Sequence, residues 1–265
     1  MIQTLDYFKM NNTKLPSISA KCITYGRTSF LEESLHSFLI QDYPGEKELV
    51  IVNDYPLQKL VFDHPQVRIY NLDETFKTIG EKENFATELC KGEIICQWDD
   101  DDVAMFWHLN NVAEQFTDDV NILHWSTGVY YNDSSITNVG WIGNSGIVFR
   151  KSAWEAIGGH PVENAGYDMT FVNALAHYGG RKFAEMPKKD ASWFYMWGGR
   201  GYHMSGMGTD TSDRANVIER HSDHIEILRK RGLIPTGDVN LNPHWELDYQ
   251  KQLEEYVSGL HNSNV

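Results

Sequence analysis

Four consecutive aspartates, Asp99 to Asp102, form the densest charge in the 265-residue chain. They follow the apolar stretch Ile94 to Trp98, so they stand where a buried strand is expected to reach solvent. Like charges this close repel unless a cation lies among them, and Lys91 is too far back along the strand to neutralise all four. In an extended chain the first and third aspartates share one face and the second and fourth the other. The spacing predicts a carboxylate pair suited to a hard cation.

A calcium loop or a solvated turn could also contain such a cluster. An EF-hand calcium loop is excluded, because Val103, Ala104 and Asn110 stand where a ligand, a glycine and a glutamate would be needed. A solvated acidic turn remains an alternative, since charge runs usually face water. The apolar strand before the cluster argues against that alternative.

Composition limits the partners of the chain. It has 23 Lys and Arg against 37 Asp and Glu, a net charge of −14. That balance argues against a nucleic-acid partner and an anionic membrane surface. The three cysteines are an odd number in apolar surroundings without a C-x-x-C pair, which predicts reduced thiols and a cytoplasmic protein. No apolar run approaches the roughly 18 residues of a membrane span, so no transmembrane segment is expected.

The elements of the first half predict a parallel sheet. Ser29 and Glu32 have the spacing of a capping box, which predicts a helix beginning there. Strands alternating with helices are typical of parallel sheets, in which ligands bind beyond the carboxyl ends of the strands. The aspartates stand at such an end. Apolar runs predict strands over 18–24, 48–53, 67–72 and 94–98, and a helix over 81–90.

The second half is less regular. Residues 132–135 predict a hairpin turn, followed by a strand over 146–150. Helices are expected over 168–178, over 212–231 and after Asn242-Pro243. His221 and His224 lie one turn apart on a charged helix and are expected on its solvated face.

Several motifs, taken in order, resemble the family 2 glycosyltransferases. They are Ile23 to Arg27, Val50 to Asp54, Gly80 to Asn84, Trp98 to Asp102, Gly143 to Arg150 and Gly158 to Asp168. The similarity covers residues 18 to 205. It implies an α/β GT-A fold, in which helices flank a Rossmann-like, mostly parallel sheet. A smaller mixed or antiparallel acceptor-side part and C-terminal helices complete that fold.

The resemblance also implies an organisation of the chain. We expect a single GT-A domain over residues 1–265, since no clear linker or internal repeat appears. The nucleotide-sugar-binding half would cover about residues 17–103 and the acceptor and catalytic half about 104–211. A C-terminal helical extension would follow from about 212 to 265.

Nucleotide contacts are implied at the ends of the first two strands. By resemblance, Thr24, Tyr25 and Arg27 belong to the loop that holds the nucleotide, with Tyr25 able to stack on a base and Arg27 able to approach phosphate. The alternative is an ordinary strand-to-helix turn. Asn53 and Asp54 match the pair that contacts uracil and ribose, and which of the two contacts the base stays open. A turn-capping role for the aspartate is the alternative.

The next two motifs complete the implied donor site. Lys82 and Asn84 fall among the donor contacts, and Glu83 stands where the family usually has an arginine, which leaves Lys82 as the available cation. The resemblance assigns Asp99 and Asp100 to the donor.

A metal ion is implied beside the donor. The resemblance assigns Asp101 to a divalent metal, Mn²⁺ or Mg²⁺, that stabilises the departing diphosphate. His203, in a glycine-rich loop, resembles the late histidine that some GT-A enzymes add to the metal site. An incidental loop histidine is the alternative.

The acceptor side is expected around Asp168. Asp168 matches the general base that removes the proton of the acceptor hydroxyl. The acid that usually precedes it is replaced by Tyr167. The alternative is a first-turn aspartate favoured by the helix dipole. Trp141 and Asn144 are candidates for the border of the acceptor pocket, with buried packing as the alternative for the tryptophan.

The resemblance implies a metal-dependent, inverting glycosyltransferase of the hexosyl or N-acetylhexosaminyl class. Its donor would be a nucleotide sugar, with UDP the first choice, and its acceptor a carbohydrate or another hydroxyl compound, in glycan or polysaccharide biosynthesis. One rival is a non-catalytic protein of the same fold that binds nucleotide sugars or carbohydrates. Another is a sugar-phosphate nucleotidyltransferase, but residues 25–29 are a poor version of the glycine- and arginine-rich loop of those enzymes.

Overall fold

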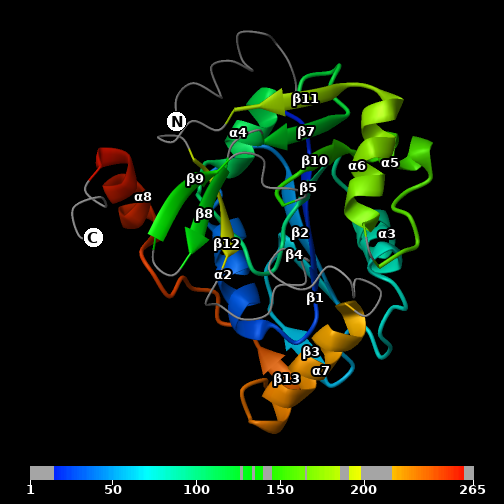
Figure 1. The fold of residues 1–265 in the computed structure, drawn as a ribbon, viewed down its shortest axis with the longest axis vertical. Helices are drawn as coiled ribbons and strands as arrows, with labels where there is room; N and C mark the ends of the chain where they lie inside the picture. The colour runs from blue at the N-terminus through cyan, green and yellow to red at the C-terminus, as the bar shows by residue number, and fades with distance from the viewer. Residues whose placement is uncertain are drawn as a thin grey trace.

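A seven-stranded sheet forms the centre of the molecule (Figure 1). The computed structural model describes residues 15–125, 128–132, 135–139, 145–164, 166–185, 191–197 and 217–259. The strand order is β11-β7-β10-β5-β1-β2-β4, and only β10 runs antiparallel to its neighbours. The mostly parallel sheet of the prediction is therefore confirmed. The strands are β1 (Ile18–Thr24), β2 (Lys47–Asn53), β4 (Val67–Asn71), β5 (Ile94–Gln97), β7 (Ile122–Trp125), β10 (Val148–Arg150) and β11 (Arg181–Ala184).

Helices cover both faces of this sheet because its strands are apolar on both. In β2, Leu49 and Ile51 pack into one core cluster while Val50 packs into another on the opposite face. The first cluster includes residues of α2 (Thr28–Leu39) and α4 (His108–Gln115). The second includes residues of α5 (Lys151–Ile157) and α6 (Tyr167–Tyr178), and α3 (Ile79–Leu89) lies on the same side (Figure 1).

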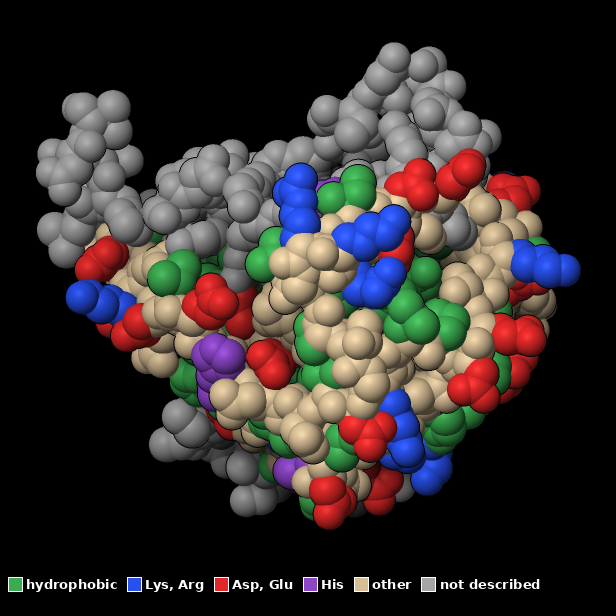
Figure 2. Space-filling view, turned by 90° about the horizontal axis from the view of Figure 1, so that it is seen from below, with side chains coloured by type: hydrophobic (Ala, Val, Ile, Leu, Met, Phe, Trp, Pro, Cys, Tyr) green, Lys and Arg blue, Asp and Glu red, His purple; other side chains and the backbone are tan. Residues whose placement is uncertain are grey.

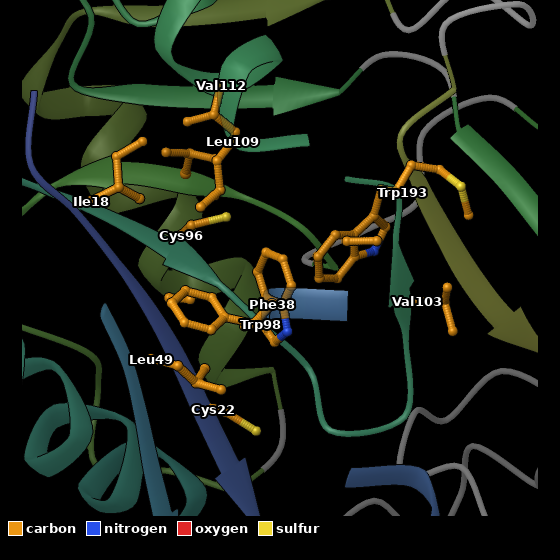
Figure 3. Packing of buried hydrophobic residues seen from close by; sticks show 14 of the residues in the cluster. Ile18, Cys22, Phe38, Leu49, Cys96, Trp98, Val103, Leu109, Val112 and Trp193 are labelled. Carbon is orange, nitrogen blue, oxygen red and sulfur yellow. The ribbon is translucent and has the colours of Figure 1, made fainter. Parts of the chain in front are cut away.

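Trp98 anchors the segment that carries the aspartates. Its ring meets Phe38 of α2 edge-on at 6.0 Å and Trp193 at 5.3 Å between ring centroids (Figure 3). Its indole nitrogen also donates to the carbonyl of Ser34 over 3.0 Å. Since Trp98 is almost fully buried and precedes Asp99, the core fixes where the acidic segment leaves the sheet.

A smaller mixed sheet stands beside the carboxyl end of β5. Its order is β6-β12-β8-β9, with β8 and β9 joined as the predicted hairpin. β12 runs parallel to β8 and antiparallel to β6. The four strands are β6 (Val103–Ala104), β8 (Gly128–Asn132), β9 (Ser135–Val139) and β12 (Trp193–Trp197).

The C-terminal segment returns to the first half of the chain. β13 (Gly237–Asn240) pairs in parallel with β3 (Gln58–Val61), a short sheet that the sequence did not predict. α7 (Val217–Lys230) lies beside this pair, and α8 (Tyr249–Ser258) lies apart from it, beside β8 and β9 (Figure 1). None of the helices in the described ranges is long and apolar enough to span a membrane.

Two predicted helix starts are wrong. Ser29 lies inside α2, whose N-cap is Arg27, so Ser29 and Glu32 form no capping box. The capping box is at Thr78 and Glu81 of α3, where each side chain bonds the other residue's backbone. The last helix begins after Asp248, whose carboxylate accepts from the amide of Lys251, rather than directly after Asn242-Pro243. The three cysteines are free and buried, as predicted.

Candidate functional site

The four aspartates form a turn rather than an extended strand. The amide of Asp102 donates to the carbonyl of Asp99 over 3.4 Å. The predicted alternation of faces is therefore wrong, because the turn brings the second and third carboxylates to one cation. Arg27, at the start of α2, pairs with Asp100 and, over 2.6 Å, with Asp101. The cation that the cluster requires comes from a residue 73 positions away from Asp100 in the chain.

Asp102 faces the core instead. Its carboxylate accepts from the Ser145 hydroxyl, from Trp193 Nε1 over 3.1 Å and from the amide of Met196 over 3.0 Å. Burial and the charge of Asp101 raise its pKa, while these hydrogen bonds oppose the shift. Asp102 therefore joins the two sheets and is not available to a ligand.

Asp99 lies at the edge of the cluster and is only partly buried. Gln97 Nε2 donates to its carboxylate over 2.8 Å, and the Ser34 hydroxyl donates to its carbonyl over 2.8 Å. Burial and the neighbouring charge of Asp101 raise the pKa of Asp99 to about 7. A ligand cation would favour the ionised form.

Asn53 and Asp54 have different roles at the end of β2. The Asn53 amide is fully buried and bonds Asn71 and the backbone at Gln58 and Tyr55, so it shapes the strand end. Asp54 pairs with Lys82 of α3. Lys82 Nζ also donates to the carbonyl of Thr24 over 2.7 Å, which ties α3 to the end of β1.

Tyr25 lies against α7. Its ring centroid is 4.9 Å from that of Tyr55 and 5.6 Å from that of His221. His221 is only 3% exposed, so its predicted place on a solvated face is wrong. Burial and the positive charge of Arg27 lower the pKa of His221 to about 3. The loop after β1 therefore has a C-terminal helix as one wall.

The Asn84 side chain links α3 to the loop after α5 through hydrogen bonds. Its side chain accepts from the amide of His160 over 2.6 Å and donates to the carbonyl of the same residue over 2.8 Å. Trp154 Nε1 donates to it as well, over 3.2 Å. These bonds occupy the amide with backbone and tryptophan partners in the structure.

Asp168 lies in the first turn of α6 and is partly buried. Burial and, after it, the charges of Glu83, Asp168 and Asp99 raise the pKa of Tyr167, the residue before Asp168. α6 packs against α3, the helix whose Lys82 bonds Asp54 and the carbonyl of Thr24.

Sequence reasoning missed two buried polar residues. Lys21 of β1 and Glu83 of α3 form an ion pair of 2.6 Å, with side chains 0% and 1% exposed. A lysine in the middle of the otherwise apolar strand ISAKCIT signals a buried partner, but it does not identify that partner.

Asp101 is the carboxylate best suited to a metal ion. Its side chain is 19% exposed, against 1% for Asp100, and it already takes a cationic partner. Carboxylate oxygens are the ligands that Mg²⁺ and Mn²⁺ prefer, so the residues present fit such an ion. Within the described ranges no three His, Cys, Asp or Glu side chains are gathered as a metal site. The predicted ligand His203 and the predicted acceptor residues Trp141 and Asn144 lie outside these ranges.

Two other features do not form part of the site. Cys96 Sγ lies 3.8 Å from His108 Nε2, but burial raises the pKa of the thiol and lowers that of the imidazole to about 3, so the pair is a packing contact. An open hollow of about 430 Å³ lies along α3 and includes Asn84, but none of the four aspartates lines it.

The charged side chains on the surface agree with the net negative charge of the chain. On the face shown in Figure 2, basic side chains form small groups between acidic ones, without a continuous basic patch over the described residues.

Comparison with known proteins agrees with this arrangement. The family model for glycosyl transferase family 2 matches residues 21–159, which include the ends of β1, β2 and β5. No curated protein sequence matches the chain.

Solved structures share the fold at low sequence identity. The structure of S. aureus TarS 1-349 in complex with UDP-GlcNAc has a TM-score of 0.59 and 18% identity, over 94% of this chain and 73% of that one. The mannosyltransferase PcManGT from Pyrobaculum calidifontis, in complex with GDP-Man and Mn²⁺, has a TM-score of 0.56 and 18% identity, over 98% and 78%. In another TarS 1-349 structure the match spans 60% of that chain.

Proposed function

Because the chain belongs to glycosyl transferase family 2, we propose that it transfers a sugar from a UDP-sugar to a hydroxyl acceptor with inversion, assisted by a divalent metal. The anomeric carbon would lie between the aspartate cluster and Asp168. The acceptor oxygen would form its bond to that carbon as the bond to the diphosphate breaks, and the hydroxyl proton would pass to Asp168.

The donor side follows from the placement of charge. Tyr25 offers an aromatic face for the base, and Asp54 with Lys82 offers an acceptor and a donor beside the ribose. Arg27 is close enough to the cluster to pass from its carboxylates to a phosphate. Asp101 would hold Mn²⁺ or Mg²⁺, which supplies charge stabilisation to the leaving diphosphate. Asp99 would orient the sugar side of the donor.

One observation carries this proposal. Arg27 pairs with Asp100 and Asp101 beyond the end of β5, and Lys82 joins Asp54, at the end of β2, to the carbonyl of Thr24 in β1. Charged side chains of both signs therefore meet at one edge of the sheet, which supports the binding of a diphosphate and a metal ion there.

Replacement of the base tests the proposal. Asp168→Asn should lower turnover by about 10²–10⁴-fold, the usual contribution of a general base, and leave the affinity for UDP with Mn²⁺ nearly unchanged. Turnover is measured as nucleotide release from a panel of UDP- and GDP-sugars, with water as the default acceptor.

The matched control is Asp248→Asn, since Asp248 also stands at a helix start but belongs to α8. It should keep full turnover. Retention of most turnover by Asp168→Asn would remove that residue from the role of base, and release from GDP-sugars alone would overturn the choice of UDP.

A further inference from the structure

The Gln58 side chain connects three segments that are far apart in the sequence. It belongs to β3 and is only 4% exposed. Its amide nitrogen donates to the hydroxyl of Thr28, the first residue of α2, over 2.9 Å and to the carbonyl of Pro235 over 2.8 Å. One buried amide group therefore joins the start of α2 and the C-terminal segment to β3.

The backbone of Gln58 is held by the elements on either side of it. The Asn53 amide donates to the Gln58 carbonyl over 3.0 Å, which fixes β3 to the end of β2. Gln58 also begins the parallel pairing of β3 with β13, where it lies opposite Gly237. Because its backbone is fixed in this way, the Gln58 side chain offers Thr28 a hydrogen-bond donor at a defined place.

The start of α2 has no side-chain cap of its own. Its N-cap residue is Arg27, and no side-chain hydrogen bond caps the helix there. Arg27 instead turns its guanidinium to Asp100 and Asp101. The hydroxyl of the next residue, Thr28, is attached to β3 through Gln58. Since an anchored residue restrains the backbone of its neighbour, this hydrogen bond limits the directions in which Arg27 can point.

We propose that Gln58 is a positioning residue, which acts through Thr28 to hold Arg27 between the acidic turn and the diphosphate of the donor. The bond to Pro235 lies outside the family match, which ends at residue 159, so the C-terminal segment takes part in this hold. The part of the inference that concerns the diphosphate rests on the proposed function. The part that concerns the acidic turn rests on the ion pairs of Arg27 alone.

Removal of the Thr28 hydroxyl tests the inference. Thr28→Val keeps the shape of the side chain and deletes the acceptor of the Gln58 bond, while Thr28→Ser retains that acceptor. With Mn²⁺ present, Thr28→Val should lower the affinity for UDP about tenfold and that for uridine less than about twofold, because only UDP has phosphates for Arg27. Thr28→Ser should bind both as wild type does. Isothermal titration calorimetry measures the two affinities.

Ser37→Ala is the matched control. Ser37 is a buried residue near the other end of α2, and its hydroxyl accepts from Trp245 Nε1 over 2.9 Å, the same length as the bond from Gln58 to Thr28. This variant should lower the melting temperature and leave both affinities unchanged. Equal UDP affinities in Thr28→Val and wild type, or an equal loss for UDP and uridine, would overturn the inference.

Gln58→Leu removes both bonds of the amide group. It should lower the affinity for UDP at least as much as Thr28→Val does, and the double variant should show no loss beyond that of Gln58→Leu, because both changes break one path. Independent, multiplying losses would contradict the inference. If Gln58→Leu does not fold, Thr28→Val and its control decide alone.

A double-mutant cycle tests the hold on Arg27 without a nucleotide. Urea unfolding of the ligand-free protein is compared for Thr28→Val, Arg27→Leu and the two together. If the hydroxyl acts through the guanidinium, its loss should lower the urea midpoint less in Arg27→Leu than in the otherwise unchanged chain. Ser37→Ala with Arg27→Leu should give additive shifts, and additive shifts for Thr28→Val would overturn the inference. Failure of the wild type to bind UDP with Mn²⁺ would instead refute the proposed function, and this cycle would still decide the hold on Arg27.

Discussion

Arg27 shows how single residues prepare the site. Without a ligand, its guanidinium offsets the charges of Asp100 and Asp101, and this pairing stabilises the acidic turn. A bound metal ion and diphosphate would replace these ion pairs with a larger set of charge interactions among the metal, the phosphates, the aspartates and Arg27. The residue thus links the stability of the turn to ligand binding.

Arg27→Leu should destabilise the ligand-free protein by about 3 kcal/mol, because Asp100 is left buried without its guanidinium partner. Mn²⁺ alone should then raise the melting temperature more in the variant than in wild type, since the ion supplies the missing charge. Differential scanning fluorimetry with and without Mn²⁺ measures both effects.

Arg68→Leu is the control for that experiment. Arg68 pairs with Glu48 over 2.7 Å at a partly buried place outside the acidic turn. Its loss should lower stability without any added response to Mn²⁺. An equal response of both variants would show that the ion does not bind where Arg27 lies.

At the scale of elements, α7 is a wall of the proposed donor site although the family match ends at residue 159. Tyr55, Ile225 and Ile234 form a small core beneath Tyr25. Gly26, in the loop between β1 and α2, has φ of +71°, and a Cβ there would lie 2.9 Å from Ile225 Cγ2. The loop can adopt this form only because residue 26 has no side chain.

Gly26→Ala should therefore weaken donor binding about tenfold by pushing the loop off α7, in addition to a cost of about 1 kcal/mol for the left-handed backbone. Isothermal titration with UDP and Mn²⁺ measures the first effect. Ile225→Ala in the same chain should restore much of the affinity.

Gly158→Ala separates the cost of the left-handed backbone from the effect of a contact with α7. Gly158 has φ of +83° with nothing within 4 Å of the added Cβ, so it carries the backbone strain alone. It should lower stability and leave UDP affinity unchanged. Equal affinities in the two alanine variants would show that α7 does not shape the donor loop.

Sequence reasoning found most of the central strands, and five of the seven were predicted within two residues. It missed β7 (ILHW), which is fully buried but only four residues long, so its apolar run is too short to mark a strand. β11 (RKFA) and β13 (GDVN) are short, polar and partly exposed, so no apolar pattern marks them. Their pairing depends on partners far away in the chain.

The same limit applies to the site. Asp54, Asp99 and Asp101 were placed at strand ends because local sequence decides where a strand stops. Their partners could not be predicted, since the turn at residues 99–102 and the reach of Arg27 and Lys82 arise only in the folded chain. Lys21 stood out as a charged residue in an apolar strand, but its ion-pair partner, Glu83, could not be predicted from the sequence.

At the scale of the whole molecule, four buried histidines make stability depend on pH. Burial lowers the pKa of His108 to about 3, of His124 to about 4 and of His221 to about 3, and it also lowers the pKa of His160. Each binds a proton more readily when unfolded. Their stabilisation is therefore complete above the unfolded pKa of about 6.5 and is lost as pH falls toward the folded values.

Unfolding by urea should show this loss. Four extra protons on the unfolded chain would cost up to about 5 kcal/mol per pH unit below pH 6.5, and the raised pKa values of Asp99, Asp100 and Asp102 oppose part of it. We expect a net fall of about 2 kcal/mol per unit between pH 6.5 and 5.

His124→Leu measures how much one histidine contributes to this pH dependence of stability. His124 is fully buried, and in the described part of the chain neither ring nitrogen has a hydrogen-bond partner. The variant should reduce the slope by about 1.4 kcal/mol per pH unit. An unchanged slope would show that this histidine is not held neutral by burial.

The central claim is that nucleotide and metal meet at the carboxyl edge of β1, β2 and β5. A crystal soaked with UDP and Mn²⁺, measured for the anomalous signal of manganese, tests it most directly. The account predicts a manganese peak on Asp101, the uracil against Tyr25, and Arg27 moved from Asp101 to phosphate. Manganese held by residues other than this turn, or UDP bound away from Tyr25 and Asp54, would contradict it.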